Sequence, residues 1–201
     1  MNRSDIAVFL DRDGTENAEV HYLSSPDKLQ LIPRTISAIR ELNDLGVKVF
    51  IISNQSGVAR GMFPESAVSV VHEALTDMLK KEGAAVDDFF YCPHLPGAAD
   101  ARYNKDCECR KPKPGMLHQA RKKYALDLQR SYVIGDRCID IAAGKAAGTG
   151  TVMVSTGYGA KEIDECRSSP DFFAVDLYDG VQYVKQKILS QERPLIYPRT
   201  V

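Results

Sequence analysis

The sequence has no surplus of charge of either sign, because its 26 Lys and Arg residues nearly balance its 27 Asp and Glu residues, for a net charge of −1. A protein that binds nucleic acid through its charge needs a basic surplus on one face, and the composition does not indicate one. We therefore expect no nucleic-acid partner. A small anionic substrate is compatible with this balance, because a few local Arg and Lys side chains are enough to hold it.

The chain also lacks long apolar runs. None approaches the roughly 20 residues of a membrane-spanning helix. The N-terminus reaches its first apolar run within a few residues, without the apolar stretch and cleavage site of a signal peptide. We therefore expect a cytoplasmic protein with no membrane partner. Five cysteines in a reducing compartment are not expected to form a disulfide framework.

Internal repeats and low-complexity tracts are absent too, which favours one globular domain. A chain of 201 residues is long enough for one sizeable core and short for two. The content of 44% hydrophobic and 26% charged residues is ordinary for a globular protein. We expect a single domain over residues 1–190 and an irregular tail over 191–201, where Pro194 and Pro198 occur.

What the chain does have is a regular alternation of apolar runs with segments of helical period. Strands are predicted over residues 6–10, 47–52, 86–92, 131–136, 149–156 and 171–175. Helices are predicted over residues 34–46, 64–83, 113–126, 138–148 and 179–191. The alternation predicts an α/β fold with a Rossmann-like, mostly parallel sheet and helices on both faces. The connections 14–32 and 92–113 are long and follow strand ends, where open α/β sheets bind ligands.

Polar side chains of a particular kind follow the predicted strands. They are Asp11, Asp13, Ser53, Asn54, Arg110, Lys111, Lys113, Asp136 and Asp140. In a parallel sheet these groups converge on one crevice. Carboxylates, small hydrogen-bond donors and a cation suit phosphoryl transfer, whose catalysis is mostly positioning and charge neutralisation.

The pair Asp11 and Asp13 raises the question of why two carboxylates follow one buried strand. They are compatible if a divalent cation lies beside them, and Asp11 with Asp136 can hold Mg²⁺, which prefers oxygen ligands. Asp11 can then attack a phosphate as nucleophile. Asp13 can protonate the leaving oxygen and later deprotonate the water that breaks the aspartyl-phosphate. The groups expected to hold the phosphoryl oxygens are Ser53, Asn54 and Lys111.

Each motif taken alone has an ordinary structural explanation. Asp-Gly-Thr is often a turn, Ser-Asn a common strand exit, and Lys-Pro-Lys-Pro a solvated loop. An Asp after a strand is often the N-cap of the next helix. The four motifs together, in order and each at a strand end, favour the catalytic interpretation.

Four soft metal ligands lie close together in the second long connection. Cys92-x-His94 is followed after twelve residues by Cys107-x-Cys109. Three Cys and one His match a closed structural Zn²⁺ site, and alternate residues of an extended segment face the same side. The alternative is incidental buried thiols and a surface histidine. Zinc is favoured because the polar residues between the pairs cannot become ordered by core burial, and it would also position the Arg110 and Lys111 side chains.

These motifs resemble those of the haloacid dehalogenase superfamily of phosphohydrolases. FLDRDGT is similar to its first motif, IISN to its second, KPKP to its lysine motif and GDRCID to its acidic motif. NQSGVARG and CRKPKPGM resemble one branch more closely, the D-glycero-D-manno-heptose-1,7-bisphosphate 7-phosphatases, with the histidinol-phosphatases as near relatives. The resemblance covers about Ile6 to about Gly157.

The resemblance implies roles for individual residues. It makes Asp11 the nucleophile and Asp13 the general acid and base. It implies that Ser53 and Lys111 steady the phosphoryl group and that Arg110 contributes to substrate recognition. The implied Mg²⁺ ligands are Asp11, Asp136 and the backbone carbonyl of Asp13. The same branch carries the Cys-x-His…Cys-x-Cys arrangement, which supports structural zinc.

The loop after the first motif departs from the pattern of the branch. Glu16 stands where relatives usually carry an apolar residue, and its charge either loosens the packing beneath the loop or pairs with a nearby Arg. Glu19 replaces an Asp and His21 replaces a Gly, whereas Asn17 and Tyr22 fit. The remaining candidate substrate contacts are Glu19, Tyr22 and Arg137. Arg137 either meets the substrate or pairs with a carboxylate.

Other chemically capable side chains are expected to be structural. His72 and His118 lie in helical segments and are interpreted as surface or packing residues. Cys138 follows the acidic motif on a helix and is expected to be buried, and Cys166 has no assigned role. No large insertion follows the first or third motif, so the domain is expected to lack a cap, to bind its substrate between the two long loops, and to be a monomer.

The leading hypothesis is a Mg²⁺-dependent phosphohydrolase that removes the 7-phosphate of a heptose 1,7-bisphosphate, in the biosynthesis of nucleotide-activated heptose. Histidinol-phosphate phosphatase is the enzyme alternative, but the cations of segment 110–113 favour a second anionic group, which histidinol phosphate lacks. A receiver-like switch that accepts phosphate on an aspartate is the alternative of another class, although it needs no leaving-group acid such as Asp13. A non-catalytic zinc module leaves the aspartates unexplained.

Overall fold

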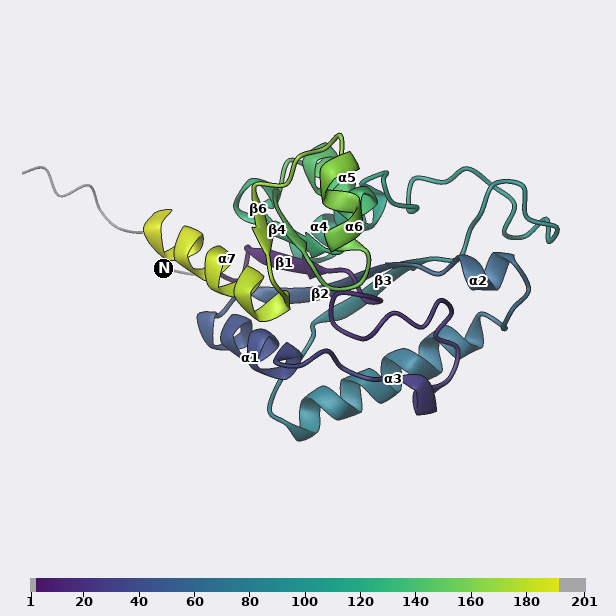
Figure 1. Ribbon diagram of the computed structural model, residues 1–201, viewed down its shortest axis with the longest axis horizontal. Coiled ribbons are helices and arrows are strands. Elements are labelled where there is room, and N and C mark those ends of the chain that lie inside the picture. The colour runs from purple at the N-terminus through teal and green to yellow at the C-terminus, as the bar shows by residue number, and fades with distance from the viewer. Residues whose placement is uncertain (1–2, 192–201) are drawn as a thin grey trace, which may run out of the picture.

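Figure 1 shows the fold in a computed structural model that describes residues 3–191. Its centre is a six-stranded sheet in the order β3-β2-β1-β4-β5-β6, in which each neighbouring pair is parallel. The strands are β1 (Ala7–Leu10), β2 (Lys48–Asn54), β3 (Asp88–Cys92), β4 (Tyr132–Gly135), β5 (Gly150–Val154) and β6 (Phe172–Ala174). The predicted α/β class with a parallel sheet is confirmed.

Helices cover both faces of this sheet (Figure 1). One face is covered by α1 (Thr35–Leu45), α3 (Ser66–Lys81) and α7 (Leu177–Gln191), and the other by α4 (Gly115–Tyr124) and α5 (Cys138–Ala147). The short elements in the connections are α2 (Ser56–Ala59), α6 (Gly159–Glu162) and the 3-10 helices η1 (Pro26–Lys28), η2 (Leu128–Arg130) and η3 (Ile163–Glu165).

The central strand β1 shows why an apolar run is needed here. Val8 and Leu10 join the core that lies against α1, α3 and α7, whereas Ala7 and Phe9 join the core against α4 and α5. All four side chains are fully buried. Successive residues of a strand face opposite sides, so a strand covered on both faces requires apolar residues at every position.

The predicted element boundaries agree with the structure to within a few residues. The helix predicted over 64–83 begins at Ser66 rather than at Pro64. Gln191 is the last residue of α7, so the prediction that the irregular tail begins there is wrong by one residue. The remainder of that tail, residues 192–201, lies outside the described residues. Among the helices within residues 3–191, none has the length and apolar character needed to cross a bilayer.

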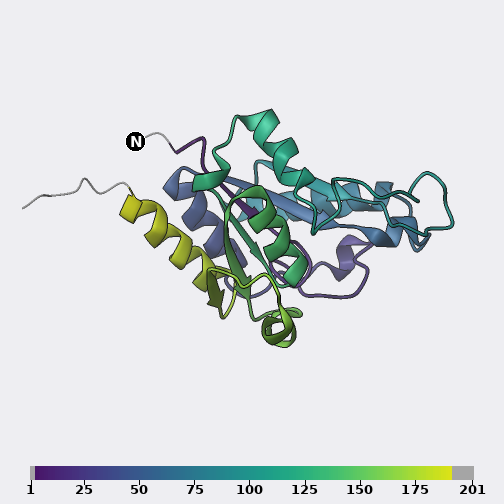
Figure 2. The same cartoon turned by 90° about the horizontal axis from the view of Figure 1, so that it is seen from above.

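The long connection between β3 and α4 projects at the end of the molecule beyond α2, on the opposite side from α7 (Figures 1 and 2). It carries no helix or strand over residues 93–114. The other long connection, between β1 and α1, contains only η1 and two isolated bridges of Asn17. Neither forms a separate domain, in agreement with the expected capless architecture.

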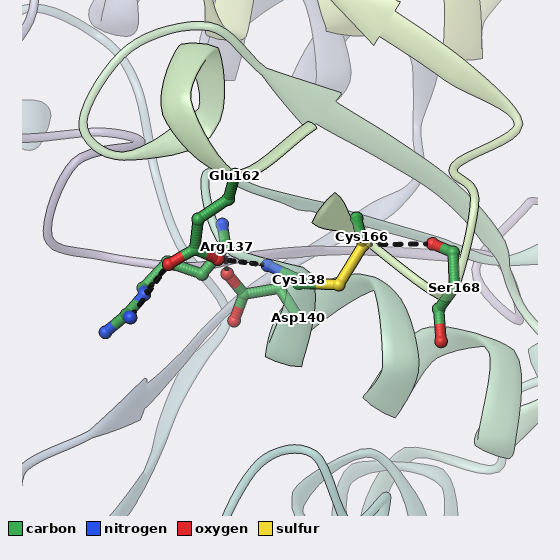
Figure 3. Close-up of a disulfide and its surroundings, with 6 residues drawn as sticks. All are labelled: Arg137, Cys138, Asp140, Glu162, Cys166 and Ser168. Carbon is green, nitrogen blue, oxygen red and sulfur yellow. Dashed lines mark hydrogen bonds and ion pairs between the residues drawn. A yellow bond between two sulfur atoms is a disulfide. The ribbon is translucent and has the colours of Figure 1, made fainter. Parts of the chain in front are cut away.

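The structure corrects one expectation about the cysteines. Cys138 and Cys166, which are 28 positions apart in the sequence, form a disulfide with their Cα atoms 5.4 Å apart (Figure 3). Cys138 is half-buried rather than buried. The redox compartment bears on whether thiols become oxidised, but it is the fold that decides which thiols lie close enough to pair. Here α5 begins at Cys138 and η3 ends just before Cys166, so the two thiols meet beside α6.

Candidate active site

The carboxyl ends of the central strands open into a pocket of about 270 Å³. The fold brings the candidate catalytic and substrate-contacting residues together here. Those lining it are Asp11, Asp13, Glu19, Tyr22, Ser53, Asn54, Arg110, Lys111 and Arg137. Lys113 is different, because its ammonium group pairs with Asp106 at 2.8 Å and it does not line this pocket. The cationic segment therefore supplies two pocket residues, Arg110 and Lys111.

Lys111 is buried between two carboxylates. Its Nζ donates a hydrogen bond to Oδ1 of Asp11, lies 2.6 Å from Oδ1 of Asp140, and donates to the carbonyl of Ile52 at 2.9 Å. The side chains of Lys111 and Asp140 are each only 1% exposed. Asp140, which the sequence analysis gave no role, thus fixes the lysine from the first turn of α5.

Asp136 lies beneath the pocket in a close backbone cradle. Its Oδ2 accepts a hydrogen bond from the backbone N–H of Tyr158 at 2.8 Å, and its Oδ1 is buried with no hydrogen-bond partner in the described part of the chain. Gly14 and Gly157 both have positive φ and pack on this carboxylate, where a Cβ atom would lie 2.3 or 2.0 Å from Oδ2. These two positions require glycine on grounds of conformation and of space.

Ligand atoms of Asp11, Asp136 and Asp140 lie within 4.8 Å of one another. Burial raises the pKa of Asp11 to about 7, partly opposed by the charge of Lys111. Burial, followed by the charges of Asp11 and Asp140, raises the pKa of Asp136 to about 9. Buried carboxylates of which Asp11 and Asp136 have raised pKa values, with Oδ1 of Asp136 left without a partner in the described residues, fit a hard divalent cation such as Mg²⁺, whose charge reverses these shifts.

Asp13 is held at the wall of the pocket by three donors. Nη2 of Arg12 lies 2.7 Å from its Oδ2, Nδ2 of Asn17 lies 3.0 Å from its Oδ1, and Nε2 of Gln55 lies 3.3 Å from its Oδ2. The Asp13 side chain remains 21% exposed. Its carboxyl group is therefore oriented by the protein while it still reaches the pocket.

The second motif supplies one residue that faces the pocket and one that supports it. Oγ of Ser53 accepts a hydrogen bond from Nε2 of Gln55 at 2.6 Å and keeps its own proton to donate. The side-chain amide of Asn54 pairs with the backbone of Lys111, donating to its carbonyl and accepting from its N–H, both at 3.0 Å. Asn54 thereby joins β2 to the loop that carries the lysine.

Behind Asp13 lies an unusual buried pair. Arg12 and Glu16 are both 0% exposed. Nη1 of Arg12 and both carboxyl oxygens of Glu16 have no hydrogen-bond partner within residues 3–191. Burial raises the pKa of Glu16 well above its ordinary value, although the charge of Arg12 lowers it. The arginine that the sequence analysis sought for Glu16 is thus a near neighbour, without a hydrogen bond between them.

The four predicted zinc ligands meet at one point. Sγ of Cys107 lies 3.1 Å from Sγ of Cys109, 3.4 Å from Sγ of Cys92 and 3.2 Å from Nδ1 of His94. None of these thiols is in a disulfide. In a tetrahedral site with Zn–S bonds of about 2.3 Å the sulfur atoms lie about 3.8 Å apart, so the four ligand atoms here are close enough to share one ion after a small adjustment. The donor set therefore fits structural zinc, and Nη1 of Arg110 donates to the carbonyl of His94 at 3.1 Å, which links the cluster to the pocket.

Arg137, which also lines the pocket, is held by side chains from the connection after β5. Its guanidinium lies 4.8 Å from the ring centroid of Tyr158 and 2.8 Å from Oε1 of Glu162. The hydroxyl of Tyr158 lies 3.4 Å from Nδ1 of His21, which occupies the left-handed region with φ of 66°. Arg137 thus lines the pocket and pairs with a carboxylate. The pairing left open by the sequence holds, and contact of Arg137 with the substrate stays a prediction.

Comparison with known proteins places the chain in a family of phosphatases. Residues 108–180 match the HAD-hydrolase-like family. The D-glycero-beta-D-manno-heptose-1,7-bisphosphate 7-phosphatase of Escherichia coli K12 is 38% identical over 189 residues, which cover 93% of this chain and 97% of that enzyme. The chain belongs to the heptose-1,7-bisphosphate 7-phosphatase family. The family is the one that the sequence motifs resemble, so that expectation is confirmed.

Relatives in this family differ in the anomer that their names specify. The beta-anomer enzyme of Rhodopseudomonas palustris is 49% identical over 143 residues, covering 71% of this chain and 79% of that enzyme. An enzyme of Photorhabdus laumondii named for the alpha anomer is 40% identical over 167 residues, covering 82% of this chain and 91% of that enzyme. The relatives at this level of identity thus include enzymes named for each of the two anomers.

A solved structure in the family shows the same fold with ligands. The D,D-heptose 1,7-bisphosphate phosphatase of B. bronchiseptica, complexed with magnesium and phosphate, superposes with a TM-score of 0.80 at 31% identity, covering 90% of this chain and 99% of that chain. This superposition shows the haloacid dehalogenase fold for the chain. It also shows that one solved member of the family contains magnesium.

Several residues that build the site escaped the sequence analysis. Gln55 bridges Ser53 and Asp13, and Glu162 and Tyr158 hold Arg137. Gln55 directly follows the second motif, so its position next to a strand end was a usable signal. Nothing in the sequence around Glu162 and Tyr158 distinguishes them from ordinary surface residues, because their partners lie at least 21 positions away.

Proposed function

We propose that this protein is a Mg²⁺-dependent phosphatase that removes the 7-phosphate of D-glycero-D-manno-heptose 1,7-bisphosphate. The family and the names of its members support the substrate. The observation that carries the chemistry is the pair Asp11 and Asp13, which face one pocket while each is held by a cation of the protein, Lys111 or Arg12. The product would feed the biosynthesis of nucleotide-activated heptose.

The proposed reaction proceeds in two displacements. In the first, a carboxylate oxygen of Asp11 attacks phosphorus, the bond to the leaving sugar oxygen breaks, and Asp13 gives its proton to that oxygen. In the second, Asp13 takes a proton from water, which attacks the aspartyl-phosphate and releases inorganic phosphate with Asp11 restored. Lys111 and the Ser53 hydroxyl hold the phosphoryl oxygens in both steps, and Asn54 keeps Lys111 in place.

The metal residues have separate proposed roles. Asp11, Asp136 and the backbone carbonyl of Asp13 would hold Mg²⁺, and the orphaned Oδ1 of Asp136 is the donor that most clearly lacks a partner. The ion would neutralise charge on the phosphoryl group and allow Asp11 to approach it. Asp140 holds Lys111, and the zinc ligands Cys92, His94, Cys107 and Cys109 order the loop that carries Arg110.

Substrate recognition is assigned to the rim of the pocket. Arg110 and Arg137 are the cations there, and they suit the second phosphate of a bisphosphate better than the amine of histidinol phosphate. Glu19 and Tyr22 line the same pocket and offer hydrogen-bond partners for the sugar hydroxyls. We further propose that the protein acts as a cytoplasmic monomer, since its pocket is complete within one chain.

The test is phosphate release with Mg²⁺ from the α and β anomers of heptose 1,7-bisphosphate, fructose 1,6-bisphosphate and histidinol phosphate. A preference of about a hundredfold or more in kcat/KM for one heptose anomer is the expected result. Asp11→Asn should abolish release, whereas Asp77→Asn, an exposed aspartate of α3, should not change it. Equal, weak activity on all four compounds would contradict the substrate, and near-full activity of Asp11→Asn would contradict the mechanism.

A further inference from the structure

Arg137 at the rim of the pocket is held more firmly than an exposed arginine usually is. Its side chain is 46% exposed, yet Nε and Nη2 both donate to Oε1 of Glu162, at 2.9 and 2.8 Å (Figure 3). Nη1 makes no hydrogen bond within the described residues. The guanidinium therefore has one edge bound by the protein and N–H groups left to bind an anion.

Glu162 is itself fixed through its second oxygen. Oε2 accepts a hydrogen bond from the backbone N–H of Cys138 at 2.8 Å, in the first turn of α5 (Figure 3). The N-terminus of a helix favours a negative charge, which suits this carboxylate. Because one oxygen binds α5 and the other binds Arg137, the carboxylate cannot turn away without losing one of these contacts.

The chain segment that carries Glu162 is anchored at both ends. At its start, Oγ1 of Thr156 donates to the carbonyl of Gly14 at 2.6 Å. At its end, Cys166 is joined to Cys138 by the disulfide (Figure 3). Between them, Tyr158 places its ring against the guanidinium of Arg137, at 4.8 Å from centroid to Cζ. A carboxylate and an aromatic ring from one anchored segment thus hold the same arginine.

We propose that Glu162 is a positioning residue. By binding one edge of the Arg137 guanidinium, it holds the other edge ready to bind the phosphate of the substrate that is not transferred. The inference rests on the proposed function, because it needs a substrate with two anionic groups. Asp11 and Lys111 would take the reacting phosphate, and Arg137 lines the same pocket with a side chain that is 46% exposed, against 1% for Lys111. A side chain that is already ordered loses less conformational entropy on binding, so Glu162 strengthens binding without touching the substrate.

The ion pair has a purely structural alternative, in which it only tethers the segment after β5 to α5. The two explanations differ in what they do to different substrates. A tether that fails disturbs Asp136, since Tyr158 binds that carboxylate, and so impairs the hydrolysis of every phosphate ester. A positioning contact that fails impairs only substrates with a second phosphate, and it does so through KM.

The experiment compares Glu162→Gln with Glu165→Gln, an exposed glutamate in η3 of the same segment. kcat and KM are measured with heptose 1,7-bisphosphate and with p-nitrophenyl phosphate, which has no second phosphate. For Glu162→Gln we expect KM for the bisphosphate to rise about tenfold more than KM for p-nitrophenyl phosphate, with kcat changed less. Glu165→Gln should behave as the wild type. Equal losses on both substrates, or no loss on either, would overturn the proposal.

Arg137→Ala separates this inference from the proposed function. If Arg137→Ala raises KM for the bisphosphate and Glu162→Gln does not, the positioning role fails and the proposed recognition by Arg137 stands. If Arg137→Ala leaves both substrates unchanged, the recognition role fails and the positioning role fails with it. In the double variant, Glu162→Gln should add no further loss to Arg137→Ala, because the two residues act as a unit.

Discussion

Lys111 and Asp140 form a buried ion pair, with 2.6 Å between Nζ and Oδ1. Burial alone lowers the pKa of Lys111, but the charges of Asp11 and Asp140 more than offset this and leave it raised, so the lysine stays protonated. We expect Asp140→Asn to reduce kcat/KM by about ten- to a hundredfold, because Lys111 loses the partner that aims it. Asp77→Asn on α3 is the control. Unchanged kinetics with Asp140→Asn would show that Asp11 and the backbone suffice to place the lysine.

The zinc cluster should be required for activity as well as for order in its loop. Arg110 binds the carbonyl of His94, so loss of the metal should displace the cations of the pocket. We expect His94→Ala to lose bound zinc and to lower kcat/KM by at least about tenfold. His118→Ala, at an exposed position on α4, should retain both. Metal analysis and kinetics check this, and full activity in zinc-free His94→Ala would refute the link to the pocket.

Glu16 should destabilise the protein, because both of its carboxyl oxygens are buried without a hydrogen bond. Replacing it by methionine, which has a similar shape, should raise the free energy of unfolding by about 1–3 kcal/mol. Because the pKa of Glu16 is raised in the folded state, the wild type loses stability as the pH rises above the ordinary carboxyl pKa. The gain in stability from Glu16→Met should therefore increase with pH. Urea unfolding at pH 5 and pH 8 measures both effects. A loss of stability in Glu16→Met would indicate that the buried charge of Arg12 needs the Glu16 carboxylate as a partner.

His72 should make the protein sensitive to acid. Burial, together with the charge of Arg12 and against that of Asp13, lowers the pKa of this histidine to about 3, and its ring stacks on Phe89 at 4.4 Å. A lowered folded-state pKa gives stability that is present above the unfolded value of about 6.5 and is lost as the pH falls through the folded value.

The comparison for this prediction is His72→Phe, which keeps a ring beside Phe89. Between pH 7 and pH 4.5 the wild type should lose about 2 kcal/mol more than His72→Phe in the free energy of unfolding. His118→Phe, at an exposed position, should follow the wild type. Parallel curves for the wild type and His72→Phe would show that the histidine becomes protonated in the folded protein.

The disulfide should stabilise the fold by closing a loop between residues 28 positions apart. Loss of a bridge over such a loop costs about 3–4 kcal/mol by the chain-entropy account. Cys166→Ser should therefore unfold at lower urea concentration than the wild type under oxidising conditions, and a phosphine reductant with zinc present should remove the difference. Equal unfolding midpoints for the oxidised wild type and Cys166→Ser would contradict this expectation.

The secondary structure was largely readable from the sequence. Apolar runs and helical periodicity place each strand and each long helix to within a few residues, because these patterns follow from burial on both faces of the sheet. The four-residue helices α2 and α6 were missed, since one turn is too short to show a period. The convergence of Asp11, Ser53 and Lys111 followed from the strand-end rule for parallel sheets.

The sequence by itself determined the α/β architecture, the family, the catalytic aspartate motif and the zinc ligand set, because each depends on residue type, spacing along the chain or order along it. Only the tertiary structure decided which distant side chains meet. The pairing of Lys111 with Asp140, of Glu162 with Arg137 and of Cys138 with Cys166 depends on how loops from different strands fold back at one edge of the sheet. Such contacts leave no periodic trace in a single sequence, because each partner is chosen by distance in space.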